Sequence, residues 1–123
     1  MMNQQIDVIK QILELMNTMA EGIAFVKGKL DQQSPEEAVN VLLDTTNAFA
    51  TIELALQPIL SKLPENSIQE KIDRLRSALA TMVSEYEQNQ GRKGQEILQF
   101  NLEPAFKNWQ TELEQVLKPY ILN

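Results

Sequence analysis

Residues 68–86 have the sequence IQEKIDRLRSALATMVSEY, and this stretch decides the fold class. Its largest apolar side chains recur three or four positions apart, at Ile68, Ile72, Leu75, Leu79, Met82 and Tyr86. This spacing brings them onto one face of an α-helix, whereas a half-buried strand would alternate apolar and polar residues. The stretch therefore predicts an amphipathic helix that buries one face in a core.

The same period continues on both sides of this stretch. It predicts a helix over residues 3–30, a second from Ser34 to the turn at Pro64, and a last one that ends at Pro119. The connections between the four helices are short, and a chain of 123 residues is long enough to bury a core of its own. We therefore predict an all-α fold, an antiparallel up-and-down four-helix bundle formed by one domain over residues 1–123.

Helix starts and prolines refine this prediction. Residues 34–37 (Ser-Pro-Glu-Glu) and 67–70 (Ser-Ile-Gln-Glu) match the capping box, so we expect them to begin the second and third helices. Pro58 and Pro104 fall inside apolar patterns that keep their phase on both sides. A loop has no reason to preserve that phase, so we predict proline kinks in the second and fourth helices rather than breaks.

The composition excludes several classes of chemistry. The chain has 17 acidic residues against 11 basic ones, a net charge of −6, and neither histidine nor cysteine. Disulfides, thiolate nucleophiles, Ser-His-Asp triads and zinc sites built on Cys or His are therefore impossible. The acidic balance argues against nucleic acid as a partner. The residues after Met1 do not look like a signal peptide, and no apolar run is long enough to span a membrane, so we expect a cytoplasmic protein.

One pattern raises the alternative of an enzyme. Glu70 and Asp73 form half of the paired Glu-x-x-Glu and Glu-x-x-Asp motif with which all-helical nucleotide pyrophosphohydrolases hold magnesium. The other half is missing, and no acid falls inside an apolar seam, where a bundle would need it to hold a hard cation. We therefore predict no enzymatic activity and no metal or other cofactor, and keep a carboxylate-based, magnesium-dependent hydrolase as the alternative from another class.

The first two helices carry more apolar surface than one core needs. On the first helix Val8 and Leu15 extend the apolar arc to about half of the circumference. On the second helix a further stripe lies about 150° from the first on a helical wheel. The stripe consists of Val39, Leu43, Ala50 and Leu54. A four-helix core cannot bury both stripes, so we predict that these six residues bind a partner; the alternative is a helix packed centrally within an irregular monomer.

The predicted function follows from that surface. We expect a non-enzymatic protein–protein interaction module that forms a homodimer or binds a different protein through its first two helices. A chaperone-like or regulatory protein that masks an amphipathic helix of a client is the alternative within the same class. Thr45 interrupts the second helix where an apolar residue is expected, and its hydroxyl could fix the register with a partner or bond back to its own helix.

Overall fold

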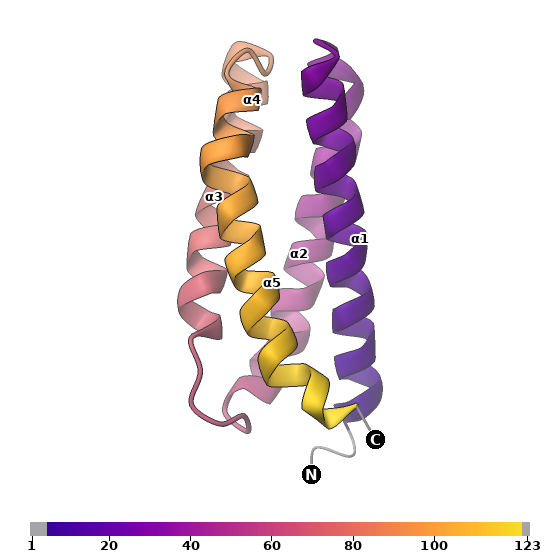
Figure 1. Cartoon of the computed structure of the whole chain (residues 1–123), viewed down its shortest axis with the longest axis vertical. Helices are drawn as coiled ribbons and strands as arrows, with labels where there is room; N and C mark the ends of the chain where they lie inside the picture. The colour runs from indigo at the N-terminus through magenta and orange to yellow at the C-terminus, as the bar shows by residue number, and fades with distance from the viewer. Residues whose placement is uncertain (1–4, 122–123) are drawn as a thin grey trace.

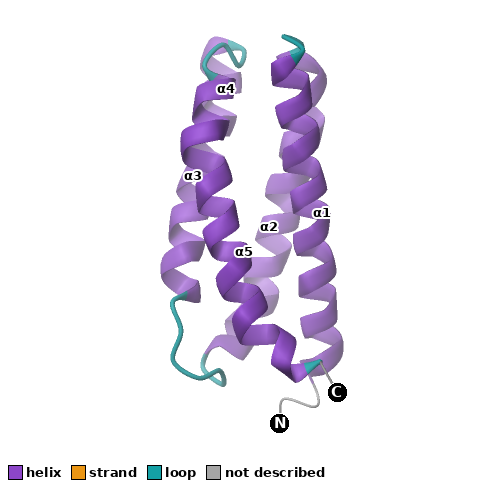
Figure 2. Ribbon diagram, in the orientation of Figure 1, coloured by secondary structure: helices purple, strands orange, loops and turns teal. Residues whose placement is uncertain are grey.

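The computed structural model of the chain describes residues 5–121. It contains the helices α1 (Ile6–Asp31), α2 (Val39–Leu60), α3 (Ile68–Asn89), α4 (Gly94–Ile97) and α5 (Glu103–Leu117). A π-helical turn, Leu98–Leu102, joins α4 to α5, and 3₁₀ turns occupy Pro35–Ala38 and Lys118–Tyr120. Figure 2 shows no strand in the described part of the chain. The predicted all-α helical bundle is confirmed.

The long segments lie side by side along one axis (Figure 1). The α1–α2 and α3–α4 connections lie at one end of the molecule, and the α2–α3 connection lies at the other. The chain therefore runs along the long axis four times, and each pass is opposite in direction to the one before it. Each outward face of the bundle consequently consists of one helix or two neighbouring helices. Exposed side chains share a surface when they lie on the same helix or on such neighbours.

One hydrophobic core runs through all the long helices. Its centre is Trp109 on α5, which has no exposed surface. The Trp109 ring lies edge-on to Phe49 of α2, with 5.7 Å between ring centroids, and 5.8 Å from Phe106. The seam predicted on α3 faces this core, since Ile68, Ile72, Leu75, Leu79 and Met82 are each at most 1% exposed.

The helix starts differ from the predicted capping boxes. Ser34 precedes a 3₁₀ turn and makes no side-chain capping bond, and α2 begins only at Val39. Ser67 makes no such bond either. The N-terminus of α3 is capped from neighbouring residues instead, because Asn66 Oδ1 accepts the Ile68 N–H at 2.9 Å and Glu112 Oε2 accepts the Ser67 N–H at 2.8 Å. A carboxylate on α5, distant in sequence, thus replaces the local cap.

Neither proline ends its helix. Pro58 lies within the last turn of α2, which continues to Leu60. Pro104 lies in the first turn of α5, directly after the π-helical turn Leu98–Leu102. The helical backbone is therefore continuous from Gly94 to Leu117, with one wider turn ahead of the proline. The kinks predicted at these two positions stay predictions.

The turn between α3 and α4 depends on a buried acid that the sequence analysis placed outside the core. Glu85 is 6% exposed, and its carboxylate accepts the Lys93 N–H at 2.8 Å and the Asn89 amide at 3.1 Å. The expectation that no acid lies in an apolar seam is therefore wrong at this position. Residues Gln90 and Gly91 turn the chain back with φ of 57° and 81°, and this brings the Lys93 N–H, directly ahead of α4, onto the carboxylate.

These hydrogen bonds lower the pKa of Glu85, the bond from the Lys93 backbone most strongly. A carboxyl whose pKa falls on folding stabilises the fold above its ordinary pKa, and this contribution is lost as the pH falls through the lower folded value. We expect wild type to be more stable than Glu85→Gln at pH 7, with the difference shrinking as Glu85 becomes protonated. Urea titrations of both proteins from pH 7 into the acid range measure this, and a difference independent of pH would contradict it.

Candidate interaction surface

The side of α2 that points away from the core is nearly free of charge. Nine residues of α2 are exposed, and Asp44 is the one charged residue among them. We call these nine residues the α2 outward face: Asn40, Leu43, Asp44, Asn47, Ala50, Thr51, Leu54, Gln57 and Pro58. Leu54 is 75% exposed and Leu43 44% exposed, although leucine is a residue that folding normally buries.

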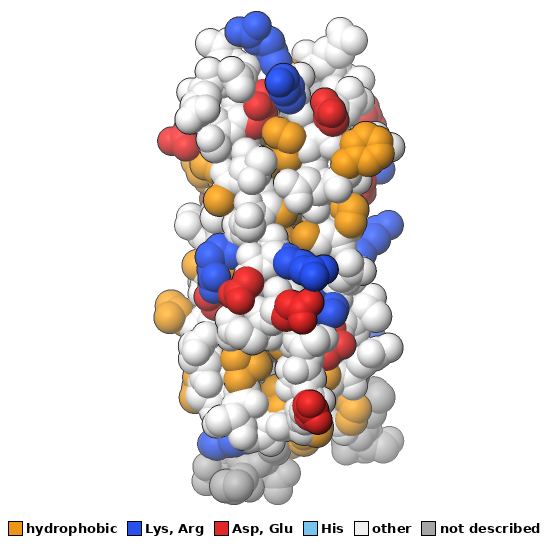
Figure 3. All heavy atoms as spheres, turned by 90° about the vertical axis from the view of Figure 1, so that its left-hand side faces the viewer, with side chains coloured by type: hydrophobic (Ala, Val, Ile, Leu, Met, Phe, Trp, Pro, Cys, Tyr) orange, Lys and Arg blue, Asp and Glu red, His pale blue; other side chains and the backbone are white. Residues whose placement is uncertain are grey.

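The exposed sides of α1 and α3 carry many more charged residues than that of α2. Six of the eleven exposed residues on α1 are charged, and so are five of the eleven on α3. Figure 3 shows the side of the molecule that includes α3, where acidic and basic side chains gather in a belt across the middle. The core of a protein–protein interface is depleted in charge. The α2 outward face has this property, and the α3 side does not.

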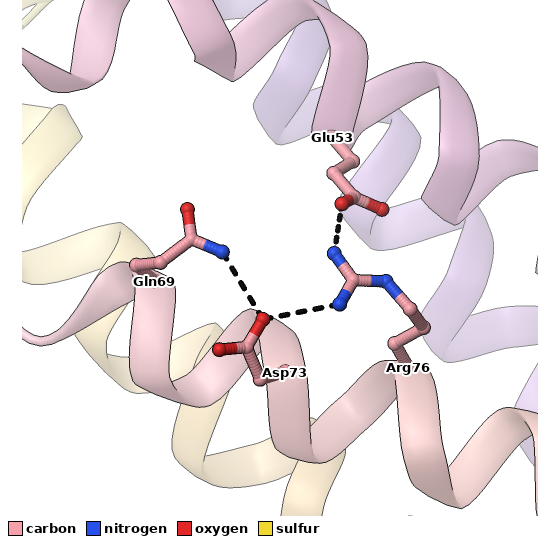
Figure 4. A network of polar contacts seen from close by, with 4 residues as sticks. All are labelled: Glu53, Gln69, Asp73 and Arg76. Carbon is pink, nitrogen blue, oxygen red and sulfur yellow. Dashed lines mark hydrogen bonds and ion pairs between the residues drawn. The ribbon is translucent and has the colours of Figure 1, made fainter.

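Part of the charged belt joins α3 to α2 (Figure 4). Arg76 forms ion pairs with Glu53 of α2 and with Asp73, and Asp73 also accepts a hydrogen bond from Gln69 at 3.1 Å. The hydrogen bond to Glu53 raises the pKa of Arg76 above its ordinary value. The half-buried Glu53 is thus already paired within the chain, which leaves Asp44 as the one charge on the α2 outward face.

The structure divides the six predicted partner-binding residues into two groups. Leu43, Ala50 and Leu54 are exposed together on the α2 outward face, and Val39 is half-buried at the start of the same helix. Val8 and Leu15 on α1 are half-buried and pack against the core of their own chain. The structure therefore exposes three of the α2 residues together and leaves Val39 and the two α1 residues half-buried.

The wide apolar arc of α1 is explained within the chain. Ile12, Met19 and Val26, which flank its main seam, are each at most 1% exposed. The reason lies in the contact between α1 and α2, where a glycine allows close approach: a methyl group at Gly22 would overlap Oγ1 of Thr45. That hydroxyl donates a hydrogen bond to the Val41 carbonyl at 2.8 Å, so Thr45 bonds back to its own helix. Most of the arc is therefore buried within the chain.

A second candidate surface lies between α1 and α5. There Ala20, Ile23, Ala24 and Phe106 form the apolar floor of a hollow of about 470 Å³. An ion pair at 3.4 Å, Lys27 to Glu103, joins the two helices beside it. Sequence analysis did not find this hollow, because its lining comes from two helices whose pairing no local pattern reveals.

Two exposed phenylalanines belong to the surface as well. Phe100, on the π-helical turn, is 72% exposed, and the sequence analysis did not select it. Its place opposite the apolar seam of its segment on a helical wheel is the signal that could have found it. Phe25 on α1 is 44% exposed, and the ammonium of Lys29 lies 5.5 Å from its ring centroid.

The carboxylates of the magnesium alternative are engaged elsewhere. Glu70 pairs with Arg74 at 3.2 Å, and Asp73 pairs with Arg76 at 3.1 Å, all on the exposed side of α3. Within residues 5–121, no three side chains of Asp, Glu, His or Cys form a group that could hold a metal ion. No helix among these residues is long and apolar enough to cross a membrane.

Comparison with known proteins identifies a family. The model of a family described as a domain of unknown function, DUF8042, matches residues 7–112. No curated protein and no solved structure matches the chain. The matched residues extend from the first turn of α1 into α5 and include the whole of α2 with its outward face. The chain therefore belongs to the DUF8042 family.

Proposed function

We propose that this protein is a non-enzymatic association module that binds another protein surface through the α2 outward face. The observation that carries the proposal is the exposure of Leu43 and Leu54 on a helix face with one charged residue. Transfer of apolar surface out of water favours association by roughly 25 cal/mol for each Å² buried. A face with one charge also gives up less hydration when it is covered than a face with many charges does.

The charges around this face support the same proposal. The sequence from Leu30 to Ser61 contains no lysine or arginine, and the chain carries a net charge of −6. Charged side chains keep an exposed surface soluble and resist its burial. On this acidic protein, charged side chains resist burial least on the α2 outward face, compared with the exposed sides of the other long helices.

The hollow between α1 and α5 supports a second candidate function. Its apolar floor and the adjacent Lys27–Glu103 pair match the two sides of an amphipathic helix, which would suit a chaperone-like or regulatory protein that masks such a helix of a client. In that case the α2 outward face would be dispensable. Substitutions confined to α2 therefore distinguish the two functions.

The test replaces both exposed leucines, as Leu43→Glu with Leu54→Glu. An apolar contact cannot accept two desolvated, unpaired carboxylates, so we expect the variant to lose association completely. Each change lies on the surface of the single chain and should alter the free energy of unfolding by only about 0.5 kcal/mol. Light scattering coupled to size-exclusion chromatography measures the mass, and circular dichroism measures the helix content.

A matched control adds the same charge elsewhere. Ser77 and Gln88 are exposed on α3 and have the same spacing in sequence as Leu43 and Leu54, so Ser77→Glu with Gln88→Glu changes the net charge equally. This control should keep the mass of wild type. Equal masses for all three proteins would show that the α2 outward face does not bind a second copy, and would leave a different protein as its partner. Unfolding of the leucine variant would show that these residues belong to the core of the single chain.

A further inference from the structure

We infer that the occupant of the α2 outward face is a second copy of this chain, whose α2 lies antiparallel across it. This inference rests on the proposed function and adds the identity of the partner and the register. The two-fold axis passes at the level of Ala48 and Phe49. Leu43 of each copy then packs on Leu54 of the other.

The spacing of exposed residues carries the argument. Along the middle of the α2 outward face, six residues are spaced alternately three and four apart, as in the seam of a two-helix coiled coil. They are Asn40, Leu43, Asn47, Ala50, Leu54 and Gln57. The positions are symmetric about the centre and pair an amide with an amide at the ends, a leucine with a leucine inside them, and Asn47 with the small Ala50 in the middle. A second copy running in the opposite direction therefore meets each residue with a residue of suitable chemistry.

Each level of that pairing is physically reasonable. The two leucine levels bury the most exposed apolar side chains of the helix against each other. The small side chain of Ala50 lies opposite Asn47, so the helices can approach closely at the centre while two polar amides fix the register. At the ends, Asn40 meets Gln57, and two amides can exchange hydrogen bonds.

The charges favour a second copy over a basic partner. A basic partner would gain its affinity from acids, and the α2 outward face offers only Asp44. Two copies of a protein with a net charge of −6 repel each other, and they approach at least cost through a nearly neutral face. Asp44 and Glu53 lie on opposite flanks of the seam, and an antiparallel pair brings like flanks together, so Asp44 of one copy does not face Glu53 of the other. The antiparallel direction also aligns the two helix dipoles favourably.

Cysteine cross-linking tests the register directly, because the natural chain has no cysteine. Leu43→Cys and Leu54→Cys are each oxidised alone and as an equal mixture. In the mixture the two thiols lie opposite each other and should form a covalent heterodimer. When one variant is oxidised alone, its cysteines occupy the same position in the two copies. These two cysteines lie about 16 Å apart along the helix, which is beyond the reach of a disulfide. The two opposed thiols in the mixed dimer should form a disulfide about tenfold or more faster than free thiols, because the dimer gives them a millimolar effective concentration.

Ser77→Cys and Gln88→Cys give the control, with the same spacing on α3. They should cross-link at the slow rate of random encounter, both alone and mixed. Cross-linking of Leu43→Cys with itself at the rate of the mixture would overturn the antiparallel register but leave the proposed function intact. A leucine mixture no faster than the control would overturn the second copy as the occupant. If wild type is monomeric and its mass equals that of the two-glutamate variant, a second copy is not the occupant, and the proposed function then requires a different protein on the α2 outward face.

Discussion

Replacing Trp109 with alanine should lower the free energy of unfolding by about 3–5 kcal/mol, the range for deleting a large aromatic side chain from a core. The indole is fully buried and touches Phe49 and Phe106, so its removal opens a cavity between α2 and α5. Those rings cannot close the space without leaving their own contacts. Urea titration followed by circular dichroism measures the loss.

Trp109→Phe is the informative comparison. Among the described residues, none accepts a hydrogen bond from the buried indole N–H. A buried donor without a partner costs about 1–3 kcal/mol, and phenylalanine removes that donor together with part of the ring. We therefore expect Trp109→Phe to lose clearly less than half as much stability as Trp109→Ala. Similar losses for the two variants would mean that the N–H is hydrogen-bonded in solution.

Gly22→Ala should destabilise the protein by about 1–3 kcal/mol, the usual range for overpacking a core contact. The added methyl group would overlap Oγ1 of Thr45, and Thr45 is 4% exposed and bonded to the Val41 carbonyl. Rotation of the Thr45 hydroxyl away from the methyl group would disrupt its hydrogen bond to the Val41 carbonyl. The two helices would have to separate, and the packing of α1 on α2 would loosen.

Two companion variants isolate this contact. Gly28 lies on the same helix, and a methyl group there meets no atom within 4 Å, so Gly28→Ala should stabilise the helix by about 0.5–1 kcal/mol. Thr45→Ala removes the obstructing oxygen, so it should rescue Gly22→Ala when the two are combined. Chemical denaturation of wild type, Gly22→Ala, Thr45→Ala and the double variant measures the coupling free energy between the two positions. Additive effects of Gly22→Ala and Thr45→Ala would show that the two residues do not touch.

Much of the fold could be predicted from local pattern. The α3 seam, from Ile68 to Met82, is buried as its spacing indicates, because a helix that packs on one core must turn its apolar residues toward it. The exposure of Leu43 and Leu54 was also predictable, since α2 carries apolar residues on two opposite sides and one core covers one of them. These conclusions need only the helical period.

The remaining features depend on contacts distant in sequence. The motif at Ser67 marked the start of α3 correctly, but the cap comes in part from Glu112 on another helix rather than from the Ser67 side chain. Glu85 is buried because the α3–α4 turn returns the chain onto its carboxylate. Val8 and Leu15 are half-buried against the core of their own chain, beside a contact in which Gly22 lets α1 and α2 approach closely. A helical wheel treats each helix alone and cannot represent such contacts.

Sedimentation equilibrium of the wild-type protein over a range of concentrations shows whether α2 pairs with a second copy of itself. If the α2 outward face binds a second copy, the apparent mass will rise from 14.0 kDa toward twice that value as the concentration increases, without larger species, because a two-fold contact closes on itself. A mass that stays at 14.0 kDa up to high micromolar concentration would contradict the claim that α2 pairs with itself.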